Sequence, residues 1–429
     1  MRGRIGFMVS MVLVGIASFL DLQGAPRSAD QLLASADTRI EEFRKADVTL
    51  IVTNAAGKPA SHVELRVEQR RHAFLFGCNV FALYEYQGEQ HRKYADRFSA
   101  LFNYATLPFY WGDYEAQKGK TLEKNVERLA QWCLQQGMVT KGHPLVWHEA
   151  YPQWGPFEVE ETEAALSKRI AEIVPHFKGL IDRWDVVNEA TVSAKFDNGV
   201  GQWARRDGAT LLVTQSLDWA RAANPESILV YNDFNLGLDL EKLLAQLVEN
   251  RASFNVIGLQ SHMHNAEWPL ERAWNECETY ARFGKPLHFT ELTVLSGEHG
   301  WEKKLPWPTT PEGERRQAAY VEQFYTLLFS HPAVEAITWW DLMDGGWQKA
   351  PAGLIRADLS PKPAFQRLLA LVKGKWWTRA ALRTEADGRC RIRGFLGDYQ
   401  VTAVTPAGTE TRQFKLLKGT NQWELQLIK

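Results

Sequence analysis

Two glutamates stand at the ends of apolar runs in this chain of 429 residues. Glu189 directly follows residues 181–188, and Glu291 closes residues 287–291. Two carboxyl groups beside one bond are what glycoside hydrolysis requires, because one protonates the leaving oxygen while the other attacks the sugar or activates water. Histidine, amide and tryptophan side chains end other apolar runs in the same way: His143, Trp147, His148, Asn188, Gln260, His262, His264, Trp339 and Trp340.

Short apolar runs alternate with amphipathic stretches from about residue 74 to residue 372. Eight strand–helix units in about 300 residues predict the α/β class and a (β/α)8 TIM barrel. A doubly wound sheet is the alternative, but no GxGxxG turn follows the first strand. Barrel active sites form at the carboxyl ends of the strands, where the two glutamates lie. The predicted strands are residues 74–80, 104–109, 139–147, 181–188, 228–232, 256–260, 287–291 and 337–341.

Both ends of the chain have a different pattern from the barrel region. A helical stretch and two alternating runs precede the barrel, and further short β runs follow it. We therefore expect small β-rich accessory units at the N-terminus and the C-terminus. The predicted domains are residues 1–24 as a signal peptide, 25–71 as a helix plus a small β unit, 72–373 as the catalytic barrel, and 374–429 as a small β-sandwich-like unit.

The composition excludes several classes of partner. Lysine and arginine number 50 against 51 acidic residues, so neither nucleic acid nor an anionic membrane is expected to bind. The 17 tryptophans suit both core packing and stacking on sugar faces. The four cysteines have no CxxC spacing, so a zinc site or redox pair is not indicated. We expect no cofactor, no metal, and a monomer.

The first 25 residues have the features of an export signal. Arg2 and Arg4 precede an apolar stretch, residues 5–20, and the small residues Gly24 and Ala25 follow it. The apolar stretch is shorter than the roughly 20 residues that span a bilayer, so cleavage is favoured over a retained anchor. The expected location is secreted or periplasmic, with no membrane attachment after cleavage.

Residues 184–190, Trp-Asp-Val-Val-Asn-Glu-Ala, closely resemble the acid/base signature of glycoside hydrolase family 10, the endo-β-1,4-xylanase family. Further segments are similar to motifs of that family and occur in the family's order. The resemblance covers about residues 74–372 and implies a barrel enzyme that acts on a polysaccharide, xylan or a related β-1,4-glycan. These further segments are residues 142–148, 231–235, 258–262, 290–292, 338–340 and 360–363.

The resemblance implies a role for each matching residue. Glu189 would be the general acid/base and Glu291 the nucleophile of a retaining double displacement, with carboxyl groups about 5–5.5 Å apart. Glu189 must start protonated, so we expect its pKa to be raised. Asn188 would hydrogen-bond the sugar 2-hydroxyl, and His262 would hold Glu291 in position. The other expected substrate-binding residues are His143, Trp147, Gln260, Trp340, Trp347, Asn235 and Tyr110.

The sequence departs from the family pattern at two places. Family members usually carry an asparagine and a lysine after strand 2, where this chain has Leu107 and Tyr110. A leucine and a phenol cannot reproduce an amide and an ammonium, so the next sugar site must differ. The aspartate usually found two residues after the nucleophile is Thr293 here. A hydroxyl would orient the histidine more weakly.

Other interpretations of the same residues lead to different functions. His143, His148, His262 and His264 could hold a metal, although the resemblance accounts for most of them without one. The chain could be a non-catalytic polysaccharide-binding protein, but binding alone does not need both glutamates and Asn188. In the C-terminal unit, packing is favoured over a carbohydrate-binding face for four aromatic residues: Trp376, Trp377, Tyr399 and Trp423.

Overall fold

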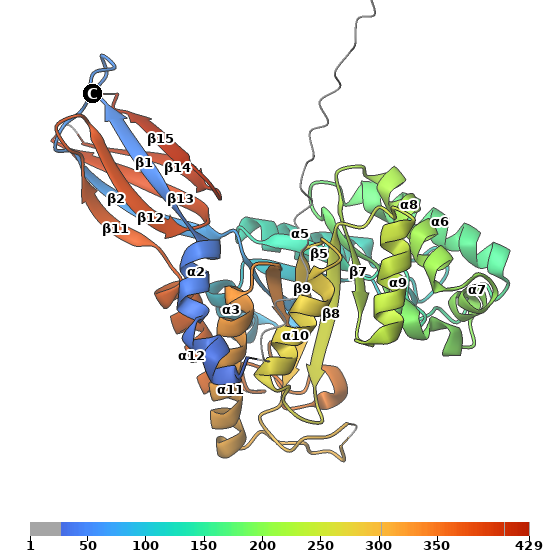
Figure 1. Ribbon diagram of the computed structural model, residues 1–429. Helices are drawn as coiled ribbons and strands as arrows, with labels where there is room; N and C mark the ends of the chain where they lie inside the picture. Colours follow the sequence, from blue (N-terminus) through green and yellow to red (C-terminus); the bar gives the residue numbers. More distant parts are fainter. Residues whose placement is uncertain (1–26, 302, 407, 429) are drawn as a thin grey trace, which may run out of the picture.

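The computed structural model describes residues 27–301, 303–406 and 408–428 of the chain (Figure 1). The predicted signal peptide, residues 1–24, lies outside the described residues. Within the described ranges, no helix is long and apolar enough to cross a membrane. All four cysteines are buried free thiols.

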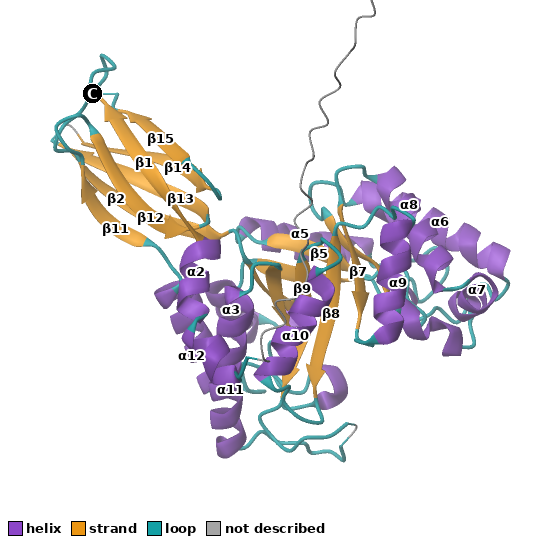
Figure 2. Ribbon diagram, in the orientation of Figure 1, coloured by secondary structure: helices purple, strands orange, loops and turns teal. Residues whose placement is uncertain are grey.

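Eight parallel strands close into a barrel in the order β10-β3-β4-β5-β6-β7-β8-β9. This confirms the predicted (β/α)8 TIM barrel, and Figure 2 shows its strands enclosed by helices. Each predicted strand overlaps an observed one. The strand predicted at residues 139–147 ends earlier, since Pro144 has no N–H to continue the ladder. The barrel strands are β3 Leu75–Asn79, β4 Tyr104–Pro108, β5 Val139–His143, β6 Arg183–Asn188, β7 Ile228–Asp233, β8 Val256–Met263, β9 Leu287–Val294 and β10 Val334–Trp339.

Amphipathic helices follow the strands and bury their apolar faces against the barrel. The start of α11 is typical: Pro311 is its first residue, and the Thr310 side chain accepts a hydrogen bond from the Gly313 N–H. The larger barrel helices are α3 Gly88–Leu101, α5 Glu123–Gln135, α6 Val159–His176, α7 Gly199–Asp207, α8 Ala209–Ala223, α9 Leu238–Glu249, α10 Leu270–Ala281, α11 Pro311–Ser330 and α12 Pro363–Ala370. The shorter ones are α4 Trp111–Tyr114, the 3-10 turns Phe81–Tyr84, Ala190–Lys195 and Trp347–Lys349, and a π turn at Leu371–Lys375.

Close packing in the barrel requires particular residues. Trp184 and Trp339 are fully buried and therefore serve core packing. A Cβ atom on Gly142 would lie 2.2 Å from the Trp184 ring. Only glycine therefore allows strands β5 and β6 to close over this indole.

The two predicted accessory units form one β-sandwich. Its sheets have the orders β12-β1-β15 and β11-β2-β13-β14, so each sheet contains a strand from the N-terminus and strands from the C-terminus. The mixture appears in Figure 1 as blue strands between red ones. The prediction of separate units at 25–71 and 374–429 is corrected in this respect. The strands are β1 Lys45–Thr53, β2 Glu64–His72, β11 Arg379–Arg383, β12 Arg389–Phe395, β13 Gly397–Thr405, β14 Gly408–Leu416 and β15 Asn421–Gln426, and helices α1 Ala29–Ala34 and α2 Ala36–Arg44 precede β1.

The aromatic residues of the C-terminal strands pack inside the structure. Tyr399 and Trp423 are 1% and 4% exposed in the core shared by the two sheets, and Trp376 is 1% exposed against the barrel. Trp377 is half-buried, with the Lys373 ammonium over its ring. Buried rings cannot stack on a polysaccharide, so the packing interpretation holds for three of the four aromatic residues.

Truncating Trp423 should destabilise the whole sandwich, because it removes packing from a core built by both ends of the chain. We expect Trp423→Ala to lower the free energy of unfolding by about 3–5 kcal/mol in urea titrations followed by circular dichroism. Trp377→Ala, at a half-buried site, is the matched control and should cost about 1 kcal/mol. Equal costs for the two variants would contradict this account of the core.

Candidate active site

A cleft with a volume of about 700 Å³ opens at the carboxyl ends of the barrel strands. It brings together both candidate catalytic glutamates and every expected substrate-binding residue except Asn235. The Asn235 backbone N–H donates to Asp233 instead, and Phe234 is the side chain of that loop that lines the cleft. The predicted residues that line the cleft are Tyr110, His143, Trp147, Asn188, Glu189, Gln260, His262, Glu291, Trp340 and Trp347.

Glu189 follows β6 in a left-handed backbone conformation, with φ 59° and ψ 40°. Its backbone N–H donates to the carbonyl of Asn232 at 2.8 Å, which fixes the turn at the end of the strand. Gln260 Nε2 donates to Glu189 Oε1 at 2.7 Å, and Trp147 Nε1 donates to Oε2 at 3.0 Å. Burial, followed by the charge of Glu291, raises the pKa of Glu189 to about 8.

Glu291 lies on β9 and has the opposite electrostatic surroundings. Asn232 Nδ2 donates to its Oε1 at 2.8 Å, His262 Nε2 lies 3.1 Å from Oε2, and His143 Nε2 lies 3.8 Å from Oε1. Burial alone would raise the pKa of Glu291, but the facing imidazoles of His143 and His262 and the Lys141 ammonium outweigh burial and lower that pKa. Glu291 is therefore ionised at a pH where Glu189 is still protonated.

Side-chain amides connect the two glutamates. Asn232 Nδ2 donates to Asn188 Oδ1 at 2.7 Å as well as to Glu291, and Gln260 Nε2 lies 3.3 Å from the same Asn188 oxygen. The Asn188 oxygen is therefore committed to protein donors, which leaves its NH2 group to donate to a bound hydroxyl. Asn232 is a site residue that sequence reasoning missed, although it lies within the segment 231–235.

A buried charged group below the cleft holds His143. Asp185 Oδ2 lies 2.7 Å from His143 Nδ1 and 2.5 Å from Lys141 Nζ, and none of these side chains is exposed by more than 1%. Burial would raise the pKa of Asp185, but Lys141 and His143 lower it. The charged Asp185 fixes the His143 ring so that its Nε2 faces Glu291.

Aromatic rings form the walls of the cleft. Tyr110 packs against His143 and Trp147 with ring centroids 5.4 and 5.6 Å apart, and Trp347 lies 4.2 Å from His262. Of the two departures after strand 2, only Tyr110 reaches the cleft. Leu107 is fully buried in the barrel core and cannot contact a sugar in this conformation.

The Thr293 hydroxyl lies where the missing aspartate was expected to act. Its Oγ1 is 3.4 Å from His262 Nδ1 and 3.3 Å from His264 Nδ1, and it accepts a hydrogen bond from the Met263 N–H. One neutral hydroxyl shared between two imidazoles orients His262 less firmly than a carboxylate would.

Residues that the sequence patterns did not single out complete the lining of the cleft. They come from the segments after β5, β7, β8 and β9, where apolar periodicity gives no signal. These additional lining residues include Glu149, Phe234, Asn265, Glu267, Trp268, Arg272 and Trp301.

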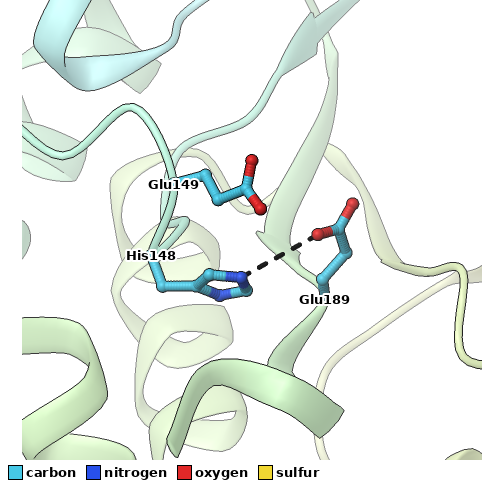
Figure 3. Close-up of side chains that lie close together, drawn as sticks. All are labelled: His148, Glu149 and Glu189. Carbon is cyan, nitrogen blue, oxygen red and sulfur yellow. Dashed lines mark ion pairs between the residues drawn. The ribbon is translucent and has the colours of Figure 1, made fainter. Parts of the chain in front are cut away.

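The histidines of the metal alternative do not form one cluster. His262 and His264 have ring centroids 6.2 Å apart and face different partners. In the described part of the chain, the group of three or more acidic, histidine or cysteine side chains whose possible ligand atoms all lie within 4.8 Å of one another consists of His148, Glu149 and Glu189 (Figure 3). Burial lowers the pKa of His148 to about 4.

A family model and several known proteins are similar to this chain. The model of the family described as Glycosyl hydrolase family 10 matches residues 71–371. Endo-1,4-beta-xylanase B of Thermotoga neapolitana is 27% identical over 286 residues, which are 62% of this chain and 78% of the relative. Anti-sigma-I factor RsgI6 of Acetivibrio thermocellus is 24% identical over 394 residues, 89% of this chain. The chain spans about half the length of that relative, 48%.

Solved structures show the same fold. A GH10 structure from Paenibacillus barcinonensis has a TM-score of 0.59 at 22% identity, covering 70% of this chain and 96% of that chain. The native xylanase 10B of Thermotoga maritima has a TM-score of 0.60 at 22% identity, covering 71% and 96%. The uncovered part of this chain corresponds in size to the β-sandwich and the N-terminus.

The protonation states of the two glutamates predict a pH profile. Hydrolysis needs Glu189 protonated, so kcat/KM for an aryl β-glycoside should fall as pH rises through about 8. Trp147→Phe removes an N–H donor that lowers the Glu189 pKa, and should move this alkaline limb upward by about one pH unit. Measuring kcat/KM between pH 4 and 10 for both proteins checks the shift. An alkaline limb near pH 5, or a downward shift in the variant, would contradict it.

Proposed function

Because the chain belongs to glycosyl hydrolase family 10, we propose that it is a retaining, endo-acting glycosidase that cleaves β-1,4-xylosidic bonds in xylan. The observation that carries this proposal is the pair of glutamates in one cleft, with the pKa of Glu189 raised to about 8 and that of Glu291 lowered. An acid and a nucleophile with separated pKa values are what double displacement needs. The relatives named xylanases support xylan as the polysaccharide.

In the first step, a Glu291 carboxylate oxygen attacks the anomeric carbon of the sugar. The bond from that carbon to the bridging oxygen breaks, and Glu189 gives its proton to this oxygen as the leaving chain departs. Asn188 donates its free NH2 group to the 2-hydroxyl, a contact that strengthens as charge develops on the ring. The product of this step is an ester between the sugar and Glu291.

In the second step, Glu189 acts as the base. Esterification removes the negative charge of Glu291, which is the second cause of the raised pKa of Glu189. The pKa of Glu189 therefore falls once the ester forms, and the carboxylate can take a proton from an incoming water. The water oxygen attacks the anomeric carbon from the face that the leaving chain vacated, and the bond from this carbon to Glu291 breaks and releases the carboxylate. The anomeric configuration is therefore retained.

Endo action is supported by the extent of the cleft and of a hollow that adjoins it. A second hollow of about 440 Å³ adjoins the cleft and shares Tyr110, Trp147, Trp340 and Trp347 with it. The cleft itself also extends to Phe234 and Trp301, which are 48% and 43% exposed. A polysaccharide longer than one sugar thus has several aromatic surfaces to contact.

Hydrolysis of a different β-1,4-glycan is the second candidate, and Tyr110 favours it. This phenol faces the cleft where family members usually carry a lysine. Its ring offers stacking in place of an ammonium, so the sugar next to the cleavage site meets a different surface. The glutamate chemistry is the same for either glycan. From the signal features of residues 1–24 we also propose export to the cell exterior or periplasm, where such polymers are met.

Product analysis tests the activity and its stereochemistry together. The protein is incubated with xylan, arabinoxylan, glucuronoxylan and mixed-linkage glucan, and the first products are followed by proton NMR. We expect β-configured xylo-oligosaccharides from the wild type. Glu291→Ala should lose at least about 10³-fold in kcat, because no nucleophile remains.

The outcomes of this experiment separate the alternatives. Release of α-configured sugars would contradict double displacement. Turnover of mixed-linkage glucan and of no xylan would favour the second candidate function, hydrolysis of a different β-1,4-glycan. Binding of a glycan without turnover, and unchanged binding by Glu291→Ala, would identify a non-catalytic polysaccharide-binding protein.

A further inference from the structure

A histidine and two glutamates meet at the edge of the cleft beside the candidate acid/base. The possible ligand atoms of His148, Glu149 and Glu189 lie within 4.8 Å of one another. Figure 3 shows the His148 ring and the Glu149 carboxylate, from adjacent positions in one loop, turned toward the carboxylate of Glu189. No step of the proposed hydrolysis uses His148 or Glu149.

The hydrogen bonds of His148 determine which of its nitrogens is free. Ser193 Oγ donates to the Glu189 carbonyl, so the same oxygen accepts from His148 Nδ1 at 2.9 Å. The proton of the neutral ring is therefore on Nδ1, and Nε2 carries a lone pair. Nε2 lies 3.9 Å from Glu189 Oε2, is fully buried, and has no hydrogen-bond partner. A buried lone pair aimed at a carboxylate is a feature of a metal ligand.

The surroundings hold the ring in this orientation. The Phe196 ring lies 3.8 Å from the His148 ring, and Asn198 Nδ2 donates to the His148 carbonyl at 2.7 Å. Glu189 is equally fixed by Gln260 and Trp147. Glu149 is exposed and lines the cleft, so an ion can reach the group from solvent. Two ligands are thus preorganised and the third is adaptable.

One imidazole nitrogen and two carboxylates select the class of ion. This donor set suits Zn²⁺ or Cu²⁺ better than Mg²⁺ or Ca²⁺, which prefer oxygen ligands alone. With bonds of about 2.0–2.2 Å and tetrahedral geometry, the ligand atoms of one ion lie about 3.3–3.6 Å from each other. The ligand atoms, which lie within 4.8 Å of one another, must therefore approach by up to about 1.5 Å, and the exposed Glu149 side chain can make most of this movement. Three protein ligands leave a fourth position for water.

We infer that His148, Glu149 and Glu189 form a binding site for a divalent transition-metal ion, and that its occupancy inhibits the enzyme reversibly. A bound ion takes a lone pair of the Glu189 carboxylate and occupies the place of the proton that the leaving oxygen needs. The binding step stands on the geometry alone, whereas the inhibition rests on the proposed function of Glu189.

Isothermal titration of the metal-free, tag-free chain with ZnCl2 tests the binding step without any turnover. We expect one site with a micromolar Kd that Glu149→Gln weakens at least about tenfold. Glu149→His, which keeps three ligands, should bind at least as tightly as the wild type. Glu85→Gln is the matched control, because Glu85 is also exposed and lines the adjoining hollow. Its Kd should equal that of the wild type.

Turnover of an aryl β-glycoside tests the inhibition in the same proteins. Zn²⁺ should lower kcat/KM of the wild type and EDTA should restore it, while Glu149→Gln should need at least about tenfold more Zn²⁺. A wild type that binds no Zn²⁺, or a Kd that is the same in Glu149→Gln, would overturn the site. Binding without inhibition would overturn the regulatory part. A metal-free enzyme without turnover would instead count against the proposed function.

Discussion

Two carboxyl groups buried in one cleft cannot both be ionised without a large electrostatic cost, and this constraint organises the site. Glu291 is kept ionised by two imidazoles and an amide, together with the Lys141 ammonium below. Glu189 has only neutral donors, so burial and the charge of Glu291 keep it protonated. The same repulsion then disappears when Glu291 forms an ester. The repulsion between the two carboxyl groups therefore makes Glu189 an acid in the first step, and its loss lets Glu189 act as a base in the second.

The barrel supplies the rigidity that this division of charge needs. Asp185 and Lys141 form a fully buried ion pair inside it, and breaking such a pair by removing one partner leaves an uncompensated charge. Their position fixes His143, and His143 faces the nucleophile. Gly142 in the same strand leaves space for the Trp184 ring. Packing and electrostatics in strands β5 and β6 are therefore linked to the chemistry at the rim.

Periodicity and local motifs predicted the barrel, because each strand and its polar end residue lie within a few positions of each other. They could not predict the shared sandwich. Alternation identifies β1 as a strand but does not name its partner, and Lys45 pairs with Phe395 from the other end of the chain. Asn232 and Glu149 were missed for a related reason: their importance depends on side chains from other strands. The resemblance to the family pattern placed Leu107 beside the substrate, yet its side chain is buried in the barrel core.

Direct titration of the two glutamates tests the central claim. The chain is labelled with glutamate carrying 13C at the carboxyl carbon, and NMR spectra are recorded from pH 3 to 10, with Glu189→Gln and Glu291→Gln assigning the two signals. The account predicts a pKa of about 8 for Glu189, a pKa below the usual glutamate value for Glu291, and a fall in the Glu189 pKa when Glu291 is replaced by glutamine. Two pKa values near that of free glutamate, or a Glu189 pKa unaffected by Glu291→Gln, would contradict it.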